Sequence, residues 1–137
     1  MPVRTAAQRR QAAKIAYNAF LEQCPSRQLL DTLSDKWVTL VLVALADGAK
    51  RHGELARAVA GVSQKMLTQT LRSLERDGLV SRDVTPSVPV RVDYALTALG
   101  AALQLQVREL KRWAELHMAR VIESRRVYDA RAAALAE

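Results

Sequence analysis

The sequence predicts a mainly α-helical single domain that carries one small β-hairpin. The chain has 137 residues, the usual size of one domain, and half of them are hydrophobic, which is enough for one core. Apolar residues recur at helical spacing over most of its length. Only over residues 79–97 do apolar and polar residues alternate as they do in strands. We therefore expect residues 1–137 to form one folded unit.

The first part of the chain is expected to form an amphipathic helix over residues 6–22, followed directly by a second helix. Cys24 is placed as the N-cap of this second helix and Pro25 as its first residue, where the missing proline N–H costs nothing. Its inner side is expected to carry three leucines: Leu29, Leu30 and Leu33.

The third helix is expected to be the buried centre of the fold. The stretch "DKWVTLVLVALADG" is apolar nearly all round, which is typical of a helix surrounded by other elements. Asp35 can cap the beginning of this helix and Gly48 can end it.

Two short helices joined by a tight corner come next. The first has Leu55 and Val59 facing inward, and "AGV" forms the corner. The second begins at Ser63, whose hydroxyl can accept a hydrogen bond from the first turn, and ends at Gly78, which suits the left-handed residue after a helix. This arrangement is the helix-turn-helix motif.

The second helix of this pair has two distinct faces. At about 100° per residue, one face collects Leu67, Leu71 and Leu74. The opposite face contains no carboxylate and consists of Lys65, Thr68, Gln69, Arg72 and Arg76. Taken alone, such a face is most often ordinary solvated surface. Its position as the second helix of a helix-turn-helix favours recognition of nucleic acid instead.

The hairpin follows directly. "LVSRDV" and "VRVDYALT" are the expected strands, and Pro86 and Pro89 stiffen the loop between them. Thr97 then caps a long helical stretch over residues 98–134, broken or continuous. A helix-turn-helix followed by a hairpin is the winged form of the motif. The predicted fold is therefore a winged helix-turn-helix over residues 24–97, flanked by terminal helices.

The charge of the chain agrees with a polyanionic partner. Its net charge is +7 and its pI is near 10.2, which indicates nucleic acid first and an acidic membrane surface second. No apolar run has the length of a membrane span, and the N-terminus lacks a secretory signal pattern. One cysteine allows no internal disulfide, and two distant histidines give no metal-site spacing. We expect a cytoplasmic protein without metal or cofactor.

Four segments together resemble one bacterial family. They are "CP" at 24–25, "DKW" at 35–37, "GELARAVAGVSQKMLTQTLRSLERDGLV" at 53–80 and "VPVRVDYALTALG" at 88–100. In order and spacing the chain resembles the HxlR-type winged-helix transcriptional regulators, a MarR-like group. It departs from the family pattern at three positions: His52, where an aromatic is usual, and Ala60 and Val90, where proline is common.

The resemblance implies a homodimer held by the terminal helices 6–22 and 98–134, acting as repressor or activator at an operator near its own gene. Two copies would bind an inverted repeat in double-stranded DNA. The expected contact set combines the recognition helix with one arginine at the base of the wing: Ser63, Gln64, Lys65, Thr68, Gln69, Arg72 and Arg91. For Arg91, an ion pair with Asp93 on the strand surface is the alternative.

Cys24 is the candidate sensor of an oxidant or electrophile. The helix N-terminus and the nearby Arg27 both favour its thiolate. The resemblance supports this role, because several family members sense such compounds through a cysteine at the same "CP" position. The alternative is a structural cysteine, which is a fair N-cap and a common small buried residue.

Three other functions remain as alternatives. One is a regulator of the same fold that binds a small ligand non-covalently in the dimer cleft, as MarR-like proteins do. Another is a winged-helix protein-interaction module, which would predict acidic residues on the polar face of the recognition helix, where there are none. An enzyme is disfavoured, because the sequence has no nucleophile–base pair, metal set or phosphate loop.

Overall fold

The computed structural model describes residues 3–136, so the outermost residues of the predicted 1–137 unit lie outside it. The described part contains helices and one hairpin in the predicted order, which confirms the fold class. The elements are α1 (Ala6–Gln23), α2 (Pro25–Leu33), α3 (Lys36–Ala44), α4 (His52–Ala58), α5 (Gln64–Arg76), β1 (Val80–Thr85), β2 (Arg91–Leu96) and α6 (Ala98–Ala136).

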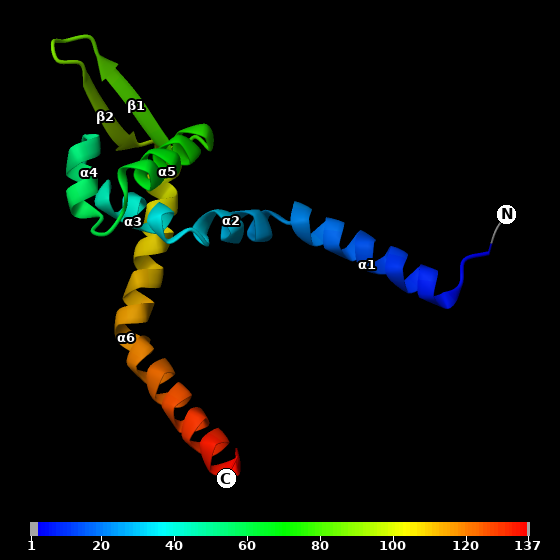
Figure 1. Cartoon of the computed structure of the whole chain (residues 1–137). Helices are drawn as coiled ribbons and strands as arrows, with labels where there is room; N and C mark the ends of the chain where they lie inside the picture. Colours follow the sequence, from blue (N-terminus) through cyan, green and yellow to red (C-terminus); the bar gives the residue numbers. More distant parts are fainter. Residues whose placement is uncertain (1–2, 137) are drawn as a thin grey trace.

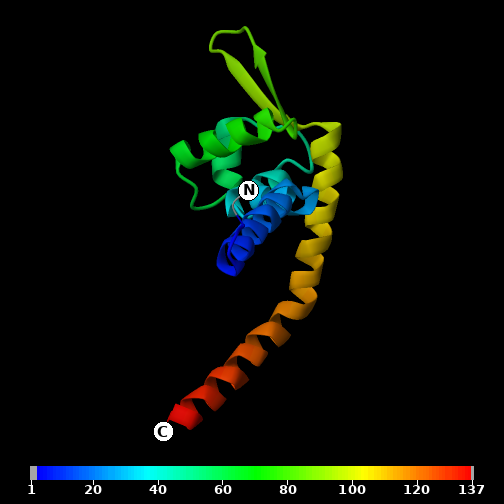
Figure 2. The same ribbon diagram turned by 90° about the vertical axis from the view of Figure 1, so that its right-hand side faces the viewer.

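The molecule has a small body with two projecting helices. The helices α3, α4 and α5, the hairpin and the first part of α6 gather into one body (Figure 1). From it, α1 and the second half of α6 extend in different directions, and the hairpin extends on the side away from the C-terminus (Figures 1 and 2). The predicted tail helix is continuous and 39 residues long.

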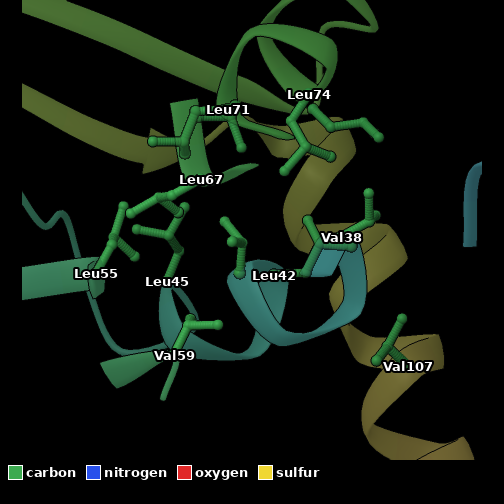
Figure 3. Packing of buried hydrophobic residues seen from close by; sticks show 12 residues of the cluster. Val38, Leu42, Leu45, Leu55, Val59, Leu67, Leu71, Leu74 and Val107 are labelled. Carbon is green, nitrogen blue, oxygen red and sulfur yellow. The ribbon is translucent and has the colours of Figure 1, made fainter. Parts of the chain in front are cut away.

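The core is built around α3, as predicted. Leu42 of α3 is completely buried and packs among leucines from α4 and α5 (Figure 3). The apolar stripe of α5 is confirmed, because each of its three leucines is at most 1% exposed: Leu67, Leu71 and Leu74. Val107 brings α6 against the same cluster. Burial of this stripe turns the opposite face of α5 toward solvent.

The predicted helix caps are present. Ser63 Oγ accepts a hydrogen bond from the Met66 N–H at 3.1 Å, and Gly78 ends α5 with a φ of +74°. Asp35 Oδ1 accepts from the Trp37 N–H at 2.9 Å. Thr97 Oγ1 accepts from the Gly100 N–H at 3.0 Å, so α6 begins where expected.

The hairpin is antiparallel and joined to the body. Val80 pairs with Leu96 at the base, and Thr85 pairs with Arg91 at the outer end, so the expected position of Arg91 at the base of the wing was wrong. Lys50, which precedes α4, exchanges two backbone hydrogen bonds of 2.8 Å with Tyr94. The wing is therefore tied to the segment that begins the helix-turn-helix.

Two local expectations were wrong. Helix α3 ends at Ala44, because residues 45–47 already form a turn, and Gly48 lies beyond that turn with a φ of +141°. On α2, only Leu33 packs against the core, whereas Leu29 and Leu30 are 42% and 63% exposed. The helix lies at the edge of the body, where its leucines border an open groove or solvent.

Candidate nucleic-acid interface

Most of the predicted contact residues of α5 are exposed to solvent. Gln64, Lys65, Gln69 and Arg72 are exposed, and the stripe of buried leucines lies on the other side of the helix. Ser63 is exposed too, although its hydroxyl already accepts the capping hydrogen bond. Lys65, Gln69 and Arg72 lie together on the polar face that the helical spacing predicts, whereas Ser63 and Gln64 stand at the N-terminal end of α5.

Thr68 differs from the rest of the set. It is half-buried at the edge of the polar face, and its Oγ1 lies 3.1 Å from Nε2 of His52 on α4. The two residues are 16 positions apart in the sequence. The Thr68 hydroxyl is thus engaged within the protein before any DNA is bound.

Arg91 forms the ion pair that the sequence offered as the alternative to a DNA contact. Its Nε lies 3.0 Å from Oδ2 of Asp93, with the arginine side chain half exposed. The hydrogen bond and charge of Asp93 raise the pKa of Arg91. Because only Nε donates to Asp93, the two terminal nitrogens can still donate to another group.

A polar cleft separates α5 from the wing. It has a volume of about 380 Å³ and is lined by Thr68, Arg72, Glu75, Arg82 and Tyr94. Over residues 3–136, neither Arg72 nor Arg82 has a carboxylate oxygen within 4.0 Å. An arginine from the recognition helix and an arginine from the wing thus face the same space together with the Glu75 carboxylate, and the two positive charges against one negative charge suit an anion such as a phosphate.

Sequence reasoning missed Arg82 as a candidate contact. The signal that could have found it is strand pairing, because Arg82 lies directly opposite Tyr94 in the hairpin register. Directly opposite residues of an antiparallel pair share one face of the sheet. That face turns toward α5, as the lining of the cleft shows.

Cys24 lies at the junction of α1 and α2 as the N-cap of α2, which confirms its predicted position. The thiol is half-buried, and no side-chain capping hydrogen bond to the helix is formed. The nearby backbone N–H groups of Arg27 and Ser26 lower the pKa of the thiol. The Arg27 guanidinium itself lies 3.6 Å from Asp31, so part of its charge is neutralised.

A second hollow lies beside Cys24. This groove between α2 and the start of α6 has a volume of about 770 Å³. Pro25 and Leu29 line one side, and Leu99 and Leu103 line the other. Leu79, which joins α5 to the wing, forms part of its floor. The groove is mainly apolar and connects to the end of the recognition helix.

Two further classes of site were sought in residues 3–136. No three side chains of histidine, cysteine, aspartate or glutamate come together there so as to hold a metal ion. None of the described helices combines the length and the apolar character needed to cross a membrane.

Known proteins similar to this chain are regulators of transcription. The family model described as HxlR-like helix-turn-helix matches residues 32–122. The "Uncharacterized HTH-type transcriptional regulator YtfH" of Escherichia coli strain K12 is 45% identical over 108 residues, which cover 79% of this chain and 86% of YtfH.

Solved structures agree with this result. The redox regulator HypR in its reduced form is 39% identical with a TM-score of 0.69, covering 74% of this chain and 99% of HypR. The reduced form of the transcriptional regulator YodB from B. subtilis is 38% identical with a TM-score of 0.61, covering 69% of this chain and 94% of YodB. Such relatives are regulators rather than enzymes. The chain belongs to the HxlR-like helix-turn-helix family of transcriptional regulators.

Proposed function

We propose that the protein is a homodimeric, sequence-specific DNA-binding regulator that recognises an inverted repeat through α5. The observation that carries the proposal is the exposed face of α5 next to a wing, which contains lysine, arginine and glutamine, with the carboxylate of Glu75 only at its edge. An acidic face would repel the duplex. A basic face of this kind neutralises phosphates and offers donors to base edges.

Each predicted contact has a defined chemical role. The first turn of α5, with Ser63, offers N–H donors to a phosphate. Lys65 reaches a guanine edge or a phosphate, and Gln69 pairs with an adenine edge. Thr68 contacts a thymine methyl, Gln64 lies at the entering end of the helix, and Arg72 contacts a phosphate. Arg91, held by Asp93, donates its free terminal nitrogens to the backbone or the minor groove.

The terminal helices are proposed to form the dimer interface, through residues 6–22 within α1 and residues 98–134 within α6. None of the residues of α1 is buried within one chain, and Tyr17 and Phe20 are exposed. On α6, Trp113 and Leu116 are exposed as well. Apolar side chains in such number on two projecting helices favour contact with a second copy.

DNA binding is tested by selecting duplexes from a random pool with the full-length protein, followed by titration of the selected sequence. We expect an inverted repeat, with half-sites one helical turn or a multiple apart. Gln69→Ala should relax the preference at one position per half-site, by about 1–3 kcal/mol. Enrichment of no sequence over random duplex would refute sequence-specific recognition.

The dimer is tested by sedimentation. Phe20→Asp on α1 and Leu116→Asp on α6 each place a charge within the proposed interface and should produce monomers. Val88→Asp is the matched control, because Val88 is a fully exposed valine of the wing loop. Equal sedimentation of wild type and both interface variants would contradict the proposed interface.

Redox or electrophile sensing through Cys24 is the proposed mode of control. The helix N-terminus and the lowered pKa of the thiol support it. HypR, a relative in structure, is described as a redox regulator. The test compares DNA binding by wild type and Cys24→Ser, each reduced and each treated with diamide or a quinone. We expect only wild type to respond, and equal responses would make Cys24 structural.

Control by a non-covalent ligand is a second candidate, and the groove between α2 and α6 favours it. A mainly apolar space of about 770 Å³ has the size of a small-molecule site. If Cys24→Ser behaves like wild type, this groove becomes the next place to search. A ligand there would touch Leu79 and could act on α5 through it.

A further inference from the structure

We propose that His52 is a positioning residue for DNA recognition. Its hydrogen bond with Thr68 holds the Thr68 hydroxyl against α4, so that only the methyl group of Thr68 can face a base. Each half-site then selects thymine at the base pair that Thr68 contacts. This inference rests on the proposed DNA-binding function. It assigns a role to a histidine that does not itself lie on the exposed face of α5.

The first step concerns the hydrogen bond itself. His52 is the first residue of α4, and its Nε2 lies 3.1 Å from Oγ1 of Thr68. Within residues 3–136, it is the only side-chain to side-chain hydrogen bond that joins two different helices. Both residues are half-buried, so water competes less for the bond than at an open surface. The bond therefore links the two helices of the motif directly through their side chains.

The second step concerns the rotamer of Thr68. Within a helix, threonine divides between two χ1 rotamers, because its hydroxyl can also bond to a carbonyl of the preceding turn. Here the hydroxyl bonds to His52 instead. This bond selects one rotamer and thereby fixes the direction of the methyl group. A free Thr68 would present hydroxyl and methyl by turns and would discriminate poorly between bases.

The third step concerns what Thr68 can then recognise. A threonine hydroxyl can bond to several base edges, whereas its methyl matches only the 5-methyl group of thymine in the major groove. Thr68 lies between Lys65 and Arg72 along the same side of α5, so it stands among the other proposed contacts. With its hydroxyl occupied by His52, Thr68 contributes an apolar contact.

The experiment uses full-length protein and the duplex selected by wild type. Each thymine of the half-site is replaced in turn by deoxyuridine, which removes only the 5-methyl group. We expect one position where wild type prefers thymine about four-fold, the size of one buried methyl. Thr68→Val, which keeps a methyl but lacks the hydroxyl, should retain the preference. Thr68→Ser, which lacks the methyl, should lose it.

The role of His52 is then isolated with two variants. His52→Phe keeps an aromatic ring but removes the hydrogen bond, and the thymine preference should fall toward one-fold. His52→Gln can still reach Thr68 with a polar group and should keep most of the preference. Because the measurement is a ratio between two duplexes, a loss of folded protein cancels. The salt dependence of binding should stay unchanged, since no phosphate contact is removed.

The outcomes separate this inference from the proposed function. If no duplex is enriched by wild type, the proposed function itself fails. If a duplex is enriched but no thymine shows methyl dependence, or if His52→Phe keeps the wild-type ratio, the role of His52 is refuted alone. If His52→Phe weakens binding to both duplexes equally and keeps the ratio, His52 does not act through the methyl group of Thr68, which also overturns the inference.

Discussion

Replacement of Gly100 by alanine should loosen the joint between the tail helix and the winged body. A Cβ atom at position 100 would stand 1.9 Å from the backbone carbonyl oxygen of Leu79 and 2.9 Å from its carbonyl carbon. An ordinary contact between carbon and oxygen is about 3.3 Å. Backbone would therefore have to move by more than about 1 Å, and the atom in the way is not the end of a flexible side chain.

The cost can be estimated from what must move. Overpacking of this kind costs about 1–3 kcal/mol. The same Leu79 oxygen accepts a hydrogen bond from the Thr97 N–H at 3.1 Å, and losing such a bond costs about 0.5–1.5 kcal/mol. Alanine gains up to about 1 kcal/mol of helix propensity. We expect Gly100→Ala to lower the free energy of unfolding by about 2–3 kcal/mol, or the Tm by roughly 6–12 °C.

Gly53→Ala is the matched control. Gly53 also lies in a helix, but a Cβ there would meet no atom within 4 Å. Helix propensity alone should make this variant as stable as wild type or more stable, by up to about 1 kcal/mol. Both variants are measured by thermal and urea unfolding at one protein concentration. If Gly100→Ala is as stable as Gly53→Ala, the close contact with Leu79 does not constrain the chain and the reasoning is refuted.

Three further predictions test the core, the wing and the thiol. Leu42 is completely buried, so Leu42→Ala should lower the free energy of unfolding by about 2–5 kcal/mol in urea titrations. Leu40 is 44% exposed, so Leu40→Ala should lower it markedly less. Equal losses of stability would contradict the placement of the core. Arg82→Ala should reduce the slope of log affinity against log salt by about 0.9, as loss of one phosphate contact would, while Arg126→Ala on the tail should leave it unchanged. The pKa of the Cys24 thiol is lowered, so its thiolate forms at lower pH than that of a free cysteine. The rate of alkylation, measured against pH, should therefore reach its midpoint at a lower pH in the folded protein than in the same chain in urea. Coincident midpoints would show that the folded helix does not lower the pKa of the thiol.

The local signals in the sequence predicted most of the elements. Helical spacing identified the buried stripe of α5, and alternation identified the two strands. The caps at Asp35, Ser63 and Thr97 were predictable because a cap depends only on residues a few positions away. The expected end of α3 at Gly48 was wrong, since glycine marks a turn without saying how many residues the turn takes.

The site could be predicted in part, for the same reason. Helical spacing places Lys65, Gln69 and Arg72 on one exposed face, and burial of the leucines confirms which face that is. Whether these side chains touch DNA stays a prediction. The same spacing put Thr68 with them but could not reveal its bond to a residue 16 positions away.

The sequence by itself determined the order of the elements, their caps and the polar face of α5, because each depends on residues within one or two turns of each other. Only the tertiary structure decided which distant residues meet. It placed His52 against Thr68, turned Arg82 toward Arg72 across the cleft, set Gly100 against Leu79 and left Leu29 and Leu30 on the surface. Such contacts arise when whole elements pack into a core, and no local pattern records the partner that packing will supply.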